Sequence, residues 1–230
     1  PAYPEGNARH FTFMLEGLKE TLAACRERGC ATLLLKGSPP ERILEIARKA
    51  ARVVTDRGYL RHLKAWRAEV ARRAGRSVEM VEGDVVVPVD LASGKRETAA
   101  RTIRPKINRQ RLDHLELPAS RGPKVRAPAG GPAALGLPAG ETLEDVAAFV
   151  DGLGTDASVA PVEAFRGGTE AARRRLAYFL AHRAPDYAAH RSDIARRVTS
   201  EISPYLHLGQ ISPVESVRKL REASSPGEED

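Results

Sequence analysis

The feature that most constrains the fold is an alternation of two hydrophobic periodicities in the N-terminal part of the chain. Apolar side chains recur at helical spacing over residues 7–29, with Asn7 as the expected N-cap and Gly29 as the expected C′ residue. Short apolar runs follow at residues 31–35 and 52–56, and a second helical segment separates them. Runs of this kind are typical of buried strands in a parallel sheet. The alternation therefore predicts an α/β domain.

Further N-terminal segments complete this pattern. They are a helix opened by a capping box at Ser38 and Glu41, a helix through Leu63, Trp66 and Val70, and β-rich runs at 77–82 and 84–89. Right-handed crossovers between successive strands predict a doubly wound sheet with helices on both faces, whose first strand is missing from this sequence. Residues 102–105 are expected in a turn. No GxGxxG or P-loop motif stands at a strand end, which argues against a generic dinucleotide or nucleoside triphosphate site in this domain.

A change in composition divides the chain. Residues 116–140 contain five prolines and five glycines, which disfavour helix and sheet alike and predict an interdomain linker with few contacts across it. Residues 1–115 are then the α/β domain, and residues 141–230 are the beginning of an all-α domain. In the second domain, Leu176 and Phe179 are expected to face a core because they lie on one side of an amphipathic helix.

The charge pattern favours an anionic partner. The formal net charge is +7, and residues 166–197 hold eight arginines against three acidic residues, a local balance of +5. Nucleic acid is favoured over a membrane because no segment is long and apolar enough to span a bilayer. A solvated helix face is the alternative explanation, and the arginines at 173–175 are expected to point outward.

Composition and cysteine usage suit a soluble, cytoplasmic protein. Hydrophobic residues make up 42% of the sequence and charged residues 29%, and no secretory leader opens it. Cys25 and Cys30 lack a His or Cys partner at zinc-ligand spacing, so we expect buried thiols rather than a disulfide or a metal site. The first residue is Pro1 rather than methionine, and we expect a piece of a longer protein, truncated at both ends.

The stretch TSEISPYLHLGQIS, from Thr199 to Ser212, combines two helix starts with several hydroxyl groups. Ser203 is the expected N-cap of a first helix and Pro204 its first helical position, and Gly209 is expected to end that helix. Ser212 and Glu215 form a second capping box, which is expected to begin the next helix. Unpaired N–H groups at a helix start attract anions, so Thr199, Ser200 and Ser203 are candidates to hold a pyrophosphate. The alternative is a helix-turn-helix corner with ordinary caps.

The same stretch resembles the flavin-binding signature of the photolyase and cryptochrome family, in which TS, any residue and LSPYLHFG precede a short polar step and IS. It departs from that form at Ile202 and Leu208, where leucine and phenylalanine are usual, and both changes keep an apolar side chain. VTDRGYLRHLKAW, VVVPV and ETAARTIRPKI, between Val54 and Ile107, resemble landmarks of class II cyclobutane pyrimidine dimer photolyases. KGSPPERI and FMLEGL resemble earlier parts of that subfamily.

This resemblance implies light-driven repair of cyclobutane pyrimidine dimers by electron transfer from reduced FAD, the reaction of a deoxyribodipyrimidine photo-lyase. It carries FAD contact, in part through backbone atoms, to Tyr187, Thr199, Ser200, Glu201, Ile202 and Ser203, and DNA contact to Arg191. No protein nucleophile acts as a catalytic residue and no metal is required. The implied partner is DNA that contains pyrimidine dimers, bound by a monomer. The resemblance leaves open whether an antenna chromophore binds the α/β domain.

Two alternatives belong to other functional classes. A cryptochrome-like photoreceptor would share the FAD site and would signal instead of repairing DNA. A DNA-binding helical module would need no cofactor, which explains the basic segment at 166–197 but not TSEISPYLHLGQIS. The family's other FAD contacts are expected beyond Asp230. We therefore expect the 230-residue chain alone to be inactive and to release FAD.

Overall fold

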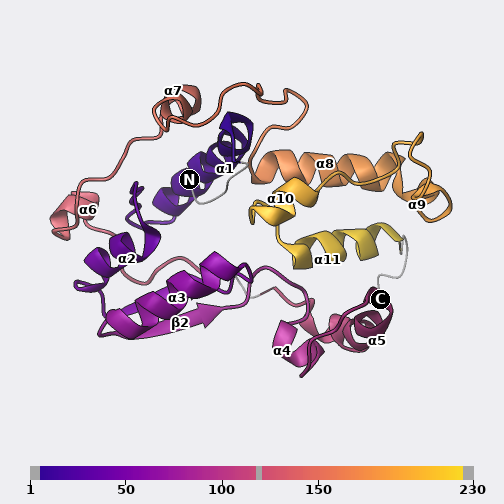
Figure 1. Cartoon of the computed structure of the whole chain (residues 1–230), viewed down its shortest axis with the longest axis horizontal. Coiled ribbons are helices and arrows are strands. Elements are labelled where there is room, and N and C mark those ends of the chain that lie inside the picture. Colours follow the sequence, from indigo (N-terminus) through magenta and orange to yellow (C-terminus); the bar gives the residue numbers. More distant parts are fainter. Residues whose placement is uncertain (1–5, 118–120, 225–230) are drawn as a thin grey trace. The chain divides into compact units, whose positions relative to one another are not determined.

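A computed structural model describes residues 6–117 and 121–224, and its elements are labelled in Figure 1. The contacts divide the chain into two compact units. These are residues 21–84 with 121–144, called the sheet unit, and residues 6–20 with 85–117 and 145–224, called the helical unit. Helix α1 (Ala8–Glu27) begins in the helical unit and ends in the sheet unit. Within the described ranges, no helix has the length and apolar character needed to cross a membrane.

The sheet unit is built on two parallel strands, β1 (Arg52–Asp56) and β2 (Ser77–Val81), which confirms two of the four predicted β segments. Helices α2 (Pro39–Ala47) and α3 (Arg61–Arg73) pack on the sheet, and α3 is drawn along β2 in Figure 1. The shared core consists of small and branched apolar side chains: Leu44, Ala47, Val53, Val70, Ala74 and Val78. Strands and crossover helix together confirm an α/β arrangement in this unit.

The two faces of this small sheet differ. Val53 and Val78 face the helices, whereas Val54 and Val81 point the other way and are 56% and 52% exposed. Side chains on successive strand positions alternate between faces, so one face of the sheet is covered and the other is open. The predicted cover of helices on both faces is therefore not found in the described part of the chain.

Two other predicted β segments are wrong. Residues 31–35 form no strand, because the carbonyl of Leu34 accepts a hydrogen bond of 2.7 Å from the Glu141 amide instead of pairing in a ladder. Residues 84–89 also form no strand. Pro88 has no amide to donate to a ladder, and its carbonyl accepts from Leu91 and Ala92 at 3.0 and 2.9 Å, which begins helix α4 (Val89–Ala92).

The turn predicted at residues 102–105 is also wrong, because these residues lie inside helix α5 (Ala100–Gln110). Pro105 removes one donor from this helix, yet a polar cluster at its start favours the helical form. The Lys106 ammonium donates to the Glu97 carboxylate at 2.6 Å and to the Ser93 hydroxyl at 3.0 Å. The Thr102 and Ile103 amides both donate to the Ala99 carbonyl, at 3.1 and 3.3 Å, so the first turn of the helix is closed by backbone atoms.

The proline- and glycine-rich segment is tied to the sheet unit. The Ala127 amide donates to the Gly29 carbonyl at 2.8 Å, the Lys49 ammonium donates to the Gly136 carbonyl, and Lys36 pairs with Glu141 at 3.6 Å. A short helix, α6 (Gly131–Ala134), also interrupts it. Residues 118–120 of the predicted linker lie outside the described residues. The proposed division into domains at 116–140 stays a prediction, since the compact units follow different boundaries.

The helical unit contains one short 3₁₀ turn and a series of α-helices. Besides α4 and α5, they are η1 (Arg111–His114), α7 (Val146–Asp151), α8 (Thr169–His182), α9 (Ala184–His190), α10 (Ser203–His207) and α11 (Pro213–Ser224). Its core joins α8 to α10 and to the residues that follow it: Ala172, Leu176, Phe179, Tyr205 and Ile211. The inward positions predicted for Leu176 and Phe179 are confirmed. From residue 141 onward, the described residues form no strand beyond one isolated bridge at Asp156.

The first part of α1 joins this core through the Phe13 ring and through hydrogen bonds between side chains and backbone atoms. Gln210, only 7% exposed, donates from its side-chain amide to the Phe13 carbonyl at 3.1 Å and accepts from the Gly168 amide at 2.8 Å. Two α1 carboxylates, Glu16 and Glu20, accept from amides at the start of α8 at 2.6 and 3.2 Å. Carboxylates at a helix start satisfy unpaired N–H groups and oppose the positive end of its dipole.

The predicted ends of α1 are confirmed. The Asn7 side-chain oxygen accepts from the His10 amide at 3.4 Å, and Gly29 has a φ of 86°. The Cys30 amide donates to the Cys25 carbonyl at 2.9 Å across this glycine, which completes a Schellman end. Both cysteines are free thiols, but they are not buried as predicted: Cys25 is partly exposed and Cys30 is exposed.

Candidate flavin-binding site

TSEISPYLHLGQIS forms the two predicted helix starts, but the first helix begins one residue earlier than predicted. Helix α10 begins at Ser203 with Ile202 as its N-cap, and no side chain caps it. The Ile202 carbonyl accepts from the Tyr205 and Leu206 amides, both at 3.0 Å. Ser203 is therefore not the N-cap, because the turn is closed by backbone atoms and the Ser203 hydroxyl makes no hydrogen bond to a described residue.

The helix end and the second helix start agree with the sequence. Gly209 has a φ of 65°, and across it the Gln210 amide donates to the Tyr205 carbonyl at 2.8 Å. Ser212 caps α11 by accepting from the Glu215 amide at 3.4 Å. The Glu215 carboxylate does not complete a capping box, because it binds Arg173 of α8 at 2.7 and 3.2 Å.

The loop before α10 is organised by Glu201. Among the described residues, Glu201 is the only non-glycine residue with a φ in the left-handed region, at 57°. Its carboxylate meets three guanidinium groups, those of Arg175 at 2.6 Å, Arg183 at 3.2 Å and Arg197 at 3.1 Å. Burial opposes its ionisation, but hydrogen bonds and charges from Arg183 and Arg197 outweigh that effect and hold the pKa of Glu201 below its ordinary value.

A pocket of about 340 Å³ lies against this ion-pair cluster, between α8, residues 164–166 and the loop. Its polar wall includes Arg174, Arg175, Arg183 and Ser200. Arg175 does not point outward as predicted, since its guanidinium lies 4.1 Å from the Phe165 ring centroid and also donates to the Ala164 carbonyl. Arg173 and Arg174 are exposed as predicted, and Arg174 also lines the pocket.

The hydroxyl groups of the loop are available for a ligand. Thr199, Ser200 and Ser203 make no side-chain hydrogen bond within the described chain, although the Thr199 carbonyl accepts from Arg183 at 3.0 Å. Ile202 is committed to the core instead, where its side chain packs against the buried cluster. Of the three, only Ser200 lines the pocket beside the arginines, where a hydroxyl suits the oxygen atoms of a diphosphate.

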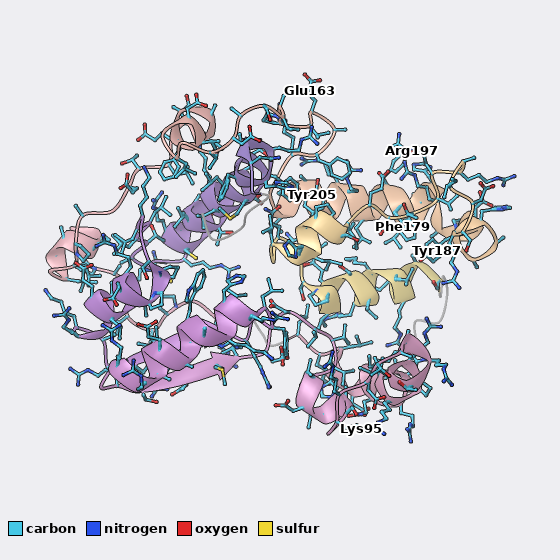
Figure 2. All side chains as sticks on the ribbon, in the orientation of Figure 1. Lys95, Glu163, Phe179, Tyr187, Arg197 and Tyr205 are labelled. Atoms are coloured by element: carbon cyan, nitrogen blue, oxygen red, sulfur yellow. The ribbon has the colours of Figure 1, made fainter. Side chains whose placement is uncertain are left out.

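The remaining two predicted residues lie in α9 and at its C-terminal end. Figure 2 shows Tyr187 beside Phe179, and their rings meet edge to face with centroids 5.8 Å apart. Arg191 follows α9, and its amide donates to the Tyr187 carbonyl at 2.9 Å, so the predicted helical spacing is correct. The Arg191 side chain is exposed and pairs with no acid in the described residues. No contact joins Tyr187 to residues 199–203 within the same part of the chain.

Sequence reasoning missed the residues that hold the loop. Arg183 contacts both the Thr199 carbonyl and the Glu201 carboxylate, and Arg175 contacts Glu201 from α8. The available signal was a single acid, Glu201, downstream of the arginine-rich segment at 166–197. Gln210 gave no signal, because a polar residue after a helix end is ordinarily exposed.

The whole-chain comparisons identify the family. The model of the DNA photolyase family matches residues 2–128, which is more than half of the chain. The chain belongs to the DNA photolyase family. A deoxyribodipyrimidine photo-lyase of Methanothermobacter thermautotrophicus is 36% identical over 96% of this chain and 47% of the relative. One of Potorous tridactylus is 30% identical over 98% of this chain and 41% of the relative. This photolyase-family chain therefore spans about half the length of these curated relatives.

A solved structure agrees on the fold. The Synechocystis cryptochrome covers 95% of this chain with a TM-score of 0.67 at 17% identity, and the chain covers 45% of it. At this identity the likeness concerns the fold alone. Photolyases and cryptochromes are thus both represented among the proteins that this photolyase-family chain resembles.

Proposed function

We propose that the complete protein is a class II cyclobutane pyrimidine dimer photolyase, which repairs DNA in a light-driven reaction as a monomeric cytoplasmic enzyme. The observation that carries this proposal is the likeness to curated deoxyribodipyrimidine photo-lyases over 96% and 98% of the chain. The class II assignment rests on the motifs between Val54 and Ile107, which resemble that subfamily.

The donor set of the loop fits the diphosphate of FAD. Thr199, Ser200 and Ser203 would hold it through their free hydroxyls and neighbouring amides, and Arg174 and Arg183 add positive charge to the adjacent wall. Ile202 would contribute only backbone atoms, since its side chain belongs to the core. Reduced FAD, when bound and excited by light, would supply the electron that opens the cyclobutane ring.

The DNA side of the proposal rests on exposed positive charge. Arg191 is exposed and without an acidic partner in the described chain, so its guanidinium is available to a backbone phosphate. A dimer must leave the duplex to reach a buried site, and extrusion of a nucleotide costs a few kcal/mol. Phosphate contacts of this kind offset part of that cost by holding the distorted backbone.

The alternative is a cryptochrome-like FAD photoreceptor without repair activity. The fold match to the Synechocystis cryptochrome favours it as the second candidate. Both candidates would use the loop at residues 199–203, so flavin binding alone does not separate them.

The deciding experiment uses the complete open reading frame. Purified protein should show the absorption bands of a bound flavin and should remove cyclobutane dimers from an oligonucleotide under blue light but not in the dark. An oligonucleotide with a (6-4) photoproduct is the matched substrate control and should remain unchanged. Bound flavin without light-dependent repair would support the photoreceptor, and absence of flavin would contradict both candidates.

A further inference from the structure

We propose that Glu201 is a positioning residue, whose side chain holds the loop at residues 199–203 in shape for a phosphate without itself contacting the ligand. This inference rests on the proposed flavin site. It reassigns Glu201 from a cofactor contact to a support of that contact, because its carboxylate is already bound by Arg175, Arg183 and Arg197.

The geometry of Arg183 carries the first step of the inference. Its Nη1 atom donates to the Thr199 carbonyl at 3.0 Å and lies 3.2 Å from the Glu201 Oε2 atom. One guanidinium nitrogen therefore bridges the residue before Ser200 and the residue after it. Since both neighbours of Ser200 are held by the same group, the Ser200 backbone has little freedom to turn.

The second step is a further anchor on the same carboxylate oxygen, from helix α8. Arg175 binds the same Oε2 atom at 2.6 Å and is itself fixed by the Phe165 ring and the Ala164 carbonyl. The Glu201 and Arg175 side chains are 18% and 21% exposed, so solvent screens this pair less than a surface pair. Arg197 closes the cluster at Oε1 but is 77% exposed, which makes it the weakest of the three contacts.

The third step is the backbone of Glu201. A φ of 57° is strained for a residue with a Cβ, and such strain persists only where surrounding contacts determine it. Glycine would adopt this φ without strain, so the backbone requirement alone would favour glycine at this position. The three arginine contacts explain why a glutamate can occupy it.

A positioning role and a direct electrostatic role of Glu201 predict opposite changes in FAD affinity when its charge is removed. Removal of a negative charge beside a bound diphosphate would strengthen binding if charge acted directly on the ligand. Loss of the loop's support would weaken it. In the complete protein, stripped of flavin and titrated with FAD, Glu201→Gln should therefore raise the dissociation constant about tenfold, the effect of losing one charge-assisted hydrogen bond.

Two further variants separate charge from backbone. Glu201→Gly relieves the φ strain and should nevertheless weaken FAD binding by a similar factor. Glu201→Asp keeps the charge and tolerates this φ, so it should restore affinity to within about threefold of the unmodified protein. An unchanged or tighter dissociation constant in Glu201→Gln, or full affinity in Glu201→Gly, would overturn the positioning role.

A flavin-free measurement keeps the inference testable by itself. Trypsin cleavage after Arg196, in the segment that leads from α9 to the loop, should be several-fold faster in Glu201→Gln than in the unmodified protein. Arg174→Gln, which removes a cation outside the ion-pair cluster, should leave the cleavage rate unchanged. Equal cleavage of both variants would overturn the support of the loop. If the unmodified complete protein binds no FAD but cleavage accelerates as expected, the proposed function fails while the role of Glu201 in holding the loop stands.

Discussion

Replacement of Gly17 by alanine should destabilise the protein, although alanine is the better helix former. A Cβ at Gly17 would lie 2.4 Å from Nε2 and 2.5 Å from Cδ of Gln210, closer than atoms can approach. Gln210 must then leave its buried position and lose its hydrogen bonds to the Gly168 amide and the Phe13 carbonyl. The alanine gains about 1 kcal/mol in helix propensity, whereas each buried polar group left unpaired costs about 1–3 kcal/mol.

The net loss expected for Gly17→Ala is therefore about 1–5 kcal/mol in the free energy of unfolding, measured by urea denaturation. A double-mutant cycle with Gln210→Ala isolates the cause, because the clash disappears when the Gln210 side chain is absent. In that background Gly17→Ala should stabilise by about 1 kcal/mol. Gly94→Ala is the matched control, since a Cβ there meets no atom within 4 Å. A higher urea midpoint for Gly17→Ala in the unmodified protein would refute the reasoning.

Three further predictions concern acid stability, the two ligands and a helix end. Hydrogen bonds, first from Lys106 and then from Thr102 and Ser93, lower the pKa of Glu97 from 4.5 to about 2, so its contribution to stability should be full above pH 4.5 and lost as the pH falls through about 2. In Glu97→Gln the free energy of unfolding should depend less on pH in that window, and the same pH dependence in both proteins would contradict this. In the complete protein, Arg191→Ala should weaken binding to dimer-containing DNA and reduce the slope of log affinity against log salt concentration by about one. Ser203→Ala should lower flavin occupancy and leave that slope unchanged, and release of FAD by Arg191→Ala with an unchanged slope would contradict the assignment of Arg191 to DNA. Gly209→Ala should cost about 1 kcal/mol in urea unfolding, because φ is 65° there and open space surrounds the position, and an unchanged midpoint would be inconsistent with this.

The parts of the fold that depend on neighbours in sequence were predictable. The ends of α1 at Asn7 and Gly29 follow from local hydrogen bonds, and β1 follows from a short apolar run between two helices. Residues 31–35 have the same local character but are not a strand, because their partner is the Glu141 segment and not a second strand. A strand exists only where a distant segment completes its ladder, and an apolar run cannot identify that segment.

Charged side chains show the same limit, both in the sheet unit and in the candidate site. Glu41 and Glu215 occupy the correct positions for capping boxes, yet both bind arginines from other helices, Arg73 and Arg173. Arg175 was expected in solvent because its helix is amphipathic, but it meets Glu201 across 26 residues of sequence. A charged residue at a helix start can serve its own backbone or a distant partner, and the sequence alone does not decide between them.

The hydrogen bond from Gln210 to Phe13 joins residues separated by 197 positions, which has a consequence during protein synthesis. Helix α1 leaves the ribosome long before α10 and α11, and its side toward Gln210 has no partner until they emerge. At about 5–20 residues per second, this interval lasts roughly 10–40 s. The nascent chain therefore exposes part of α1 to chaperones or to neighbouring nascent chains for that time, and slower translation would lengthen the exposure.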